Sequence, residues 1–165
     1  MTVSSSVASA RHVNPEIQGF AGITEIQRYG IKERRICGCS EVLELSYDFS
    51  CRIIRLYKYL NEGKLGKADR DIIDAMGRQL VRSATSINAN MNEAQHPQSD
   101  ADFLSKASIA LKEARESENW LSLLRDNGFL EPRAAESLLL DCGHINKILI
   151  TITAKVRKRI HGAKE

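Results

Sequence analysis

The sequence predicts an all-α protein, an antiparallel up-down-up-down four-helix bundle preceded by an N-terminal extension. Apolar residues recur at spacings of three and four in four segments between residues 40 and 159, which is the period of a helix with one buried face. Short connections join the segments, so consecutive helices should be antiparallel neighbours. A chain of 165 residues suits a single domain. We therefore expect an extension at residues 1–39, the bundle at 40–161 and a tail at 162–165.

The extension and the first two helices differ clearly in pattern. Residues 1–39 contain one proline, four glycines and weak periodicity, with at most a short helix expected near residues 24–35. Ser40 is the predicted N-cap of a helix over residues 40–62. Its apolar face comprises Val42, Leu45, Phe49, Ile53, Leu56 and Leu60. The next helix is predicted over residues 69–95 and stops before Pro97. Its apolar stripe comprises Ile72, Met76, Leu80, Ser83, Ile87, Met91 and Ala94.

The third and fourth helices have the clearest repeats. Ser99 is the predicted N-cap of a helix over residues 99–127, which Asn127 and Gly128 close. Its stripe follows a heptad spacing: Phe103, Ala107, Ala110, Ala114, Ser117, Leu121 and Leu124. The last helix is predicted over residues 132–159, with a core stripe of Leu138, Cys142, Ile145, Leu149, Ile152 and Val156. It carries further apolar residues at Leu139, Leu140, Ile148 and Ile150. Because one bundle core needs a single stripe, these predict an interface.

Composition excludes two classes of protein. Apolar residues make up 42% of the chain, too many for a disordered protein, and no apolar run approaches the roughly 20 residues of a membrane-spanning helix. Residues 1–10 lack the basic start and apolar core of a secretory signal. The four cysteines form no disulfide pattern. We therefore expect a protein of the reducing cytoplasm that does not associate with membranes.

Charge is distributed unevenly along the chain, although the net charge is only +3. Residues 147–165 hold six basic side chains against one acid, and residues 28–35 hold four against one, so the remainder is mildly acidic. The six basic residues near the C-terminus are Lys147, Lys155, Arg157, Lys158, Arg159 and Lys164. They are our candidate nucleic-acid-binding residues, because basic clusters bind phosphate backbones. The alternative is a solvated helix end, where the helix dipole favours cations.

Two carboxylate–histidine pairs have the spacing that di-iron bundle proteins use. Glu93 with His96, and Asp141 with His144, are each three residues apart. In the predicted bundle the two pairs lie about 20 Å apart along the axis, at about 1.5 Å per residue, so they cannot share two metal ions. No nucleophile–base set or glycine-rich phosphate loop is present. We therefore expect no metal site, no cofactor and no enzymatic activity.

A polar set lies beside the apolar stripes of the two middle helices. Its members are Arg82, Ser86, Asn90, Glu93, Glu113 and Glu116. Because these helices are neighbours, Arg82 should reach an acid of the second helix, and Ser86 and Asn90 should bond across to it. We interpret the set as a structural polar network that fixes helix register, with a ligand site as the alternative.

Two segments of these helices resemble a known family. Residues 82–94, RSATSINANMNEA, resemble the second-helix signature R-x-x-x-S-I-x-x-N-x-x-E-[GA] of the four-helix bundle family that includes the 23S rRNA intervening-sequence proteins. Asp102–Phe103, followed by residues 109–121, resembles its third-helix signature. Asn88 stands where many members carry proline, and Ala94 where many carry glycine. The resemblance covers residues 40–165 and leaves the extension out.

The resemblance implies a small bacterial cytoplasmic protein that assembles as a homopentamer. A relative, the accessory variability determinant of diversity-generating retroelements, is a pentamer that binds nucleic acid and a reverse transcriptase. We therefore expect a non-catalytic nucleic-acid-binding or RNA-associated accessory protein acting as a ring. The alternative is a scaffold that docks a partner such as a reverse transcriptase through the ring or through apolar residues of the extension, namely Ile17, Phe20, Ile23 and Ile26.

Overall fold

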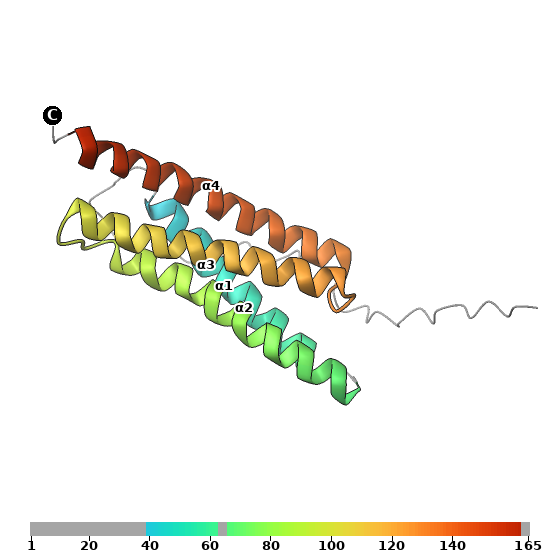
Figure 1. The fold of residues 1–165 in the computed structure, drawn as a ribbon. Helices are drawn as coiled ribbons and strands as arrows, with labels where there is room; N and C mark the ends of the chain where they lie inside the picture. The colour runs from blue at the N-terminus through green and yellow to red at the C-terminus, as the bar shows by residue number, and fades with distance from the viewer. Residues whose placement is uncertain (1–38, 63–65, 163–165) are drawn as a thin grey trace, which may run out of the picture. The chain divides into compact units, whose positions relative to one another are not determined.

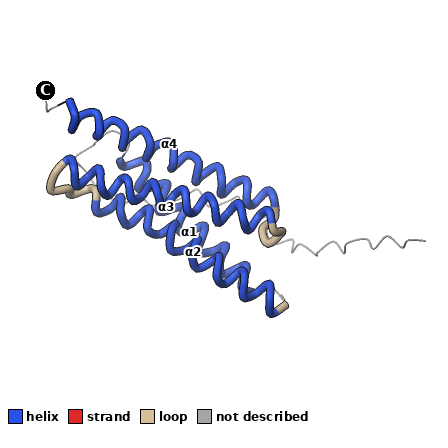
Figure 2. The backbone as a smooth tube through the Cα atoms, viewed as in Figure 1, coloured by secondary structure: helices blue, strands red, loops and turns tan. Residues whose placement is uncertain are grey.

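The computed structural model describes residues 39–62 and 66–162, which form four helices (Figure 1). They are α1 (Cys39–Glu62), α2 (Lys67–Glu93), α3 (Asp100–Asp126) and α4 (Pro132–Gly162). Each helix contacts its two neighbours in the cyclic order α1–α2–α3–α4, and the contact between α1 and α4 is the smallest. Figure 2 shows that helices and loops make up the described residues. The predicted antiparallel four-helix bundle is therefore confirmed, whereas the helix expected near residues 24–35 lies outside the described residues.

The helix ends show which local signals were informative. Ser99 caps α3 as predicted, because its hydroxyl accepts a hydrogen bond from the backbone N–H of Asp102 at 3.1 Å. Gly128 follows α3 with a φ of 72°, which is the left-handed conformation expected of a glycine at a helix end. The prediction for Ser40 is wrong, because α1 already begins at Cys39 and Ser40 lies inside it. α4 extends three residues past its predicted end, to Gly162.

The core is one continuous cluster of apolar side chains from all four helices, and it runs along the bundle. All seven stripe residues predicted for α3 are buried, and so are all six predicted for α4. Three alanines in the middle of α3 have no exposed surface. Small side chains there let the backbones of the neighbouring helices approach closely, and α3 is in extensive contact with both α2 and α4.

The first half of α2 faces the core differently from the prediction. Ile72 is 45% exposed and Met76 is only partly buried, whereas Ile73 and Gly77 are buried. The cause is Tyr57 of α1, whose ring lies directly over Gly77. Only a glycine leaves room for this ring, so the row of Ile73 and Gly77, not the row of Ile72 and Met76, faces α1.

Candidate nucleic-acid interface

The C-terminal end of α4 carries exposed cations on a part of the helix that α1 does not cover. Glu41, near the start of α1, lies 3.6 Å from His144, so the later turns of α4 run on beyond the start of α1. On those turns Lys155, Arg157 and Lys158 are exposed. They lie within one turn of each other, and none forms an ion pair with a described residue. These three side chains are therefore available to a ligand.

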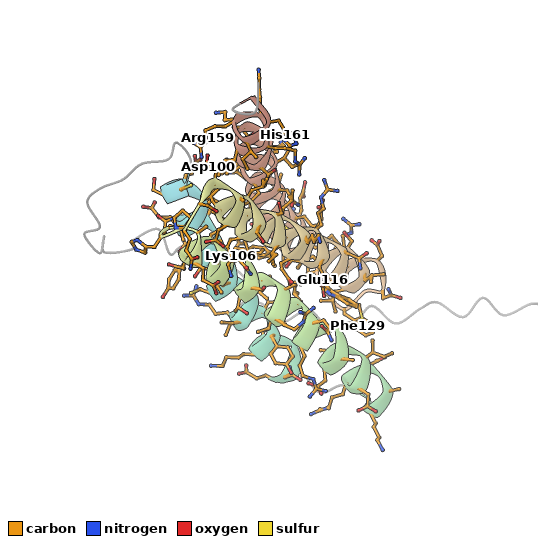
Figure 3. All side chains as sticks on the ribbon, turned by 60° about the vertical axis from the view of Figure 1, so that its left-hand side comes forward. Asp100, Lys106, Glu116, Phe129, Arg159 and His161 are labelled. Carbon is orange, nitrogen blue, oxygen red and sulfur yellow. The ribbon has the colours of Figure 1, made fainter. Side chains whose placement is uncertain are left out.

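Two of the six candidate basic residues are not counted among these free cations: Arg159 is paired, and Lys164 is not described. Arg159 donates two hydrogen bonds to the carboxylate of Asp100 at the start of α3, one of them from Nε at 2.6 Å. Figure 3 shows these two side chains facing each other at the end of the bundle. Arg159 thus ties α4 to α3, and its charge is matched by an acid. Lys164 lies outside the described residues.

A shallow hollow lies on the same part of α4, lined by Ala154, Arg157, Lys158 and His161. Nδ1 of His161 lies 2.7 Å from the backbone oxygen of Arg157, one turn earlier. As the donor of this bond, Nδ1 leaves Nε2 directed away from the helix backbone. The surface of the hollow is mostly apolar, and Arg157 and Lys158 place two positive charges at its edge.

Lys147 is exposed on the outer side of α4, about 10 residues before the three free cations. At about 1.5 Å per residue, the side chains are separated by about 12 to 17 Å along the helix. Lys147 is therefore apart from the terminal cluster, although the sequence places it in the same basic segment.

The predicted polar set is brought together in part, between α2 and α3. Arg82 donates a hydrogen bond to Glu116 at 2.7 Å, and the Nε1–H of Trp120 donates to the same oxygen at 3.2 Å. Glu93 pairs with Lys106 near the other end of the same interface. Figure 3 shows Lys106 and Glu116 on one side of the bundle. These ion pairs align α2 with α3.

The prediction that Ser86 and Asn90 bond across to the third helix is wrong. The side-chain amide of Asn90 donates to the backbone oxygen of Ser86 at 2.9 Å and to its hydroxyl at 3.3 Å. Both residues lie on α2. An amide side chain bonds the preceding turn of its own helix without needing a partner helix, and this local bond prevails here.

Glu113 has the least satisfied carboxylate of the set. Its Oε2 atom is buried and accepts no hydrogen bond from any described residue. Burial raises the pKa of Glu113, Arg82 opposes this shift, and the negative charge of Glu116 adds to it. Glu113 thus lies in the α2–α3 interface without forming one of its hydrogen bonds.

Several of the cross-helix polar contacts that sequence reasoning missed involve small hydroxyl groups. Ser83 of α2 and Ser117 of α3 are buried and their hydroxyls are 2.8 Å apart. The hydroxyl of Ser50 donates to the backbone oxygen of Ala84 at 2.9 Å. The sequence did contain a sign of the first pair, because the stripes predicted to be buried on α2 and α3 each include a serine, Ser83 and Ser117. Both contacts fix helix register.

Two further contacts link elements that are distant in sequence. Arg52 of α1 pairs with Asp141 of α4 and also donates to Ser137 at 2.9 Å. The Sγ–H of Cys142 on α4 donates to the backbone oxygen of Ala114 at 3.1 Å, and burial raises the pKa of this thiol to about 12. These bonds hold α4 between α1 and α3 and are structural.

No group of three or more His, Cys, Asp or Glu side chains that could hold a metal ion occurs within residues 39–62 and 66–162. Over the same residues, no helix has the length and apolar character needed to span a membrane. The candidate docking residues of the extension, such as Phe20, lie outside the described residues.

Comparison with known proteins finds a family model and solved structures that match this chain. A family model described as 23S rRNA-intervening sequence protein matches residues 39–151. A solved structure from Bacteroides thetaiotaomicron VPI-5482, described as a protein of unknown function from the S23 ribosomal protein family, is 42% identical. That match covers 72% of this chain and 99% of the other, with a TM-score of 0.63. No curated protein matches the chain. The family match ends before Lys155, so it does not rest on the terminal cations.

Proposed function

Because the chain belongs to the 23S rRNA-intervening sequence protein family, we propose that it is a non-catalytic, RNA-associated protein of the bacterial cytoplasm that binds nucleic acid. The binding surface is the end of α4, where Lys155, Arg157 and Lys158 contact the phosphate backbone of RNA or DNA. Phosphate contacts carry no sequence information, so this binding is general.

One observation carries the proposal, namely that these three cations are unpaired among the described residues while Arg159 is paired. The bond of Arg159 to Asp100 fixes the end of the helix, so the three cations are presented from a rigid support. The helix dipole also favours cations near this end of α4. Unpaired lysine and arginine side chains that extend into solvent can in addition bind an external anion.

We further propose that the protein acts as a homo-oligomeric ring, a homopentamer as its family resemblance implies. Each subunit then contributes one cluster of cations to the same rim. Several weak phosphate contacts on one assembly bind a long nucleic acid more tightly than a single contact does. The affinity should fall steeply with salt, because each neutralised phosphate releases counterions.

The test is fluorescence anisotropy of labelled single-stranded RNA and DNA with the full-length protein at several salt concentrations. We expect binding at low salt that weakens as salt rises, and a large loss of affinity in the double variant Arg157→Gln/Lys158→Gln. The matched control is Lys58→Gln/Lys67→Gln, which removes the same charge from exposed positions at the opposite end of the bundle. Absence of binding at low salt, or an equal loss in the control, would overturn the proposal.

A second candidate function, docking of a protein partner such as a reverse transcriptase, is favoured by large exposed apolar side chains. Ile72 of α2 is 45% exposed and Ile109 of α3 is 37% exposed. Pull-down of a candidate partner with the wild type, compared with Ile72→Lys, tests this function. Equal recovery by the two proteins would count against docking through this surface.

A further inference from the structure

The outer side of α1 carries a row of residues that no described helix covers. Glu44, Tyr47, Cys51 and Ile54 follow each other at spacings of three and four, so they share one helix face. Tyr47 and Ile54 are 56% and 41% exposed. We call this row the α1 outer row. This row faces away from α2 and α4, because Ser50 hydrogen-bonds to α2 and Arg52 pairs with α4 from other sides of α1.

The outer side of α4 carries a second row with the same spacing. Leu140, Gly143, Lys147 and Ile150 form this α4 outer row, and Leu140 and Ile150 are 68% and 44% exposed. A side chain added at Gly143 would meet no atom within 4 Å, so nothing within the subunit requires a glycine there. A glycine inside a helix is less stable than alanine, and no contact among the described residues accounts for the glycine at this position.

The two rows complement each other in charge and in shape. Glu44 and Lys147 are opposite charges, and neither forms an ion pair among the described residues. Tyr47 is a large flat side chain, and Gly143 leaves space for one. Each row also presents aliphatic surface, at Ile54 and at Leu140.

The matching residues lie at similar heights along the bundle. Within one subunit, Arg52 contacts Asp141 and Glu41 contacts His144, so the first half of α1 lies beside the middle of α4. Rotation about an axis parallel to the bundle keeps every residue at its own height. In a ring with such an axis, Tyr47 of one copy would face the region of Gly143 in the next, and Glu44 would face the region of Lys147 about one turn further along α4.

We propose that the occupant of the α4 outer row is the α1 outer row of a second copy of this chain. The contact joins two different faces, so it is head-to-tail, and its repetition gives a ring when the rotation between neighbours closes. The inference rests on the proposed self-association and assigns the faces that meet. It also separates two roles within the basic segment: Lys147 serves assembly, while Lys155, Arg157 and Lys158, beyond the start of α1, stay free at the rim.

The native Cys51 allows a direct test by disulfide cross-linking. Light scattering first establishes the mass of the wild-type assembly. In the variant Leu140→Cys, the new thiol should form a disulfide with Cys51 of the neighbouring copy under mild oxidation. A non-reducing gel should then show a ladder of covalent multimers that disappears in Leu140→Cys/Cys51→Ser. The matched control is Leu123→Cys on α3, at a side chain that is 38% exposed but lies outside both rows, and it should give no ladder through Cys51.

Charge reversal provides an independent measurement. Glu44→Lys and Lys147→Glu should each shift the assembly toward monomer by at least tenfold in dissociation constant, and the double variant should restore it. Circular dichroism checks that each variant is helical. A monomeric wild type would overturn the proposed self-association and this inference with it. An oligomeric wild type without a Cys51-dependent ladder, or without rescue in the double charge reversal, would overturn the assignment of the faces alone.

Discussion

The packing of Tyr57 against Gly77 leads to a quantitative prediction for the variant Gly77→Ala. A Cβ atom at position 77 would lie 2.5 Å from Cδ2 and 2.7 Å from Cε2 of the Tyr57 ring, distances that real contacts do not adopt. The ring has little freedom to move away, because its hydroxyl donates to Oδ1 of Asp74 at 2.6 Å. Alanine at position 77 must therefore displace the ring and weaken this hydrogen bond.

The size of the effect follows from three contributions. Replacing a glycine inside a helix by alanine gains about 1 kcal/mol from helix propensity. Overpacking against a fixed ring costs about 1–3 kcal/mol, and losing the bond to Asp74 costs about 1 kcal/mol. We therefore expect Gly77→Ala to lower the free energy of unfolding by about 1–3 kcal/mol, although the same change at an open helical site is stabilising.

Urea unfolding followed by circular dichroism measures this effect, with all proteins at one concentration because self-association adds to stability. The decisive comparison is the same change in a Tyr57→Ala background, where the ring is absent. There Gly77→Ala should raise the free energy of unfolding by about 1 kcal/mol, the propensity gain alone. A loss of equal size in both backgrounds, or a gain in the wild-type background, would refute the reasoning.

Three further predictions follow from the polar contacts. Because burial raises the pKa of Glu113 in the folded protein, its ionised carboxylate lowers the stability of the fold as pH rises through that pKa. Glu113→Gln should therefore raise the melting temperature at pH 7 and raise it by less near pH 4. An equal gain at both pH values would contradict this. The pKa of Cys142 is raised to about 12, so iodoacetamide at pH 8 should leave it unmodified in the folded protein. Peptide mass spectrometry showing it alkylated as fast as in the urea-unfolded protein would disprove this. The coupling between Arg82 and Glu116 should stay below about 1 kcal/mol in a double-mutant cycle, since solvent reaches both side chains; a coupling above about 2 kcal/mol would show that the pair is not screened.

Periodicity alone predicted the fold where apolar residues are unambiguous. The α3 stripe keeps one heptad register over seven positions from Phe103 to Leu124, so its buried face is defined even where apolar residues such as Leu104 and Leu123 lie beside it. The start of α2 is different, because Ile72 and Ile73 are adjacent and equally apolar. Which of them faces the core depends on Tyr57, a residue of another helix, and a local pattern contains no information about that contact.

The candidate site was predictable to a similar extent. Charge clustering identified Lys155, Arg157 and Lys158 from the sequence, and the structure places all three in solvent. The pairing of Arg159 with Asp100 was not predictable, because it depends on how far α4 extends past α3. The failure at Asn90 has a simpler cause: the sequence indicates which groups share a face, but a local bond to the preceding turn competes with any bond across it.

The central claim is that the cations at the end of α4 bind nucleic-acid phosphates, and the salt dependence of RNA affinity tests it most directly. A plot of log affinity against log salt concentration should be linear and steep for the wild type. Its slope should become shallower by about one for each phosphate-contacting cation removed, as in Arg157→Gln and then Arg157→Gln/Lys158→Gln. An affinity that does not change with salt, or a slope that stays the same in both variants, would contradict the claim.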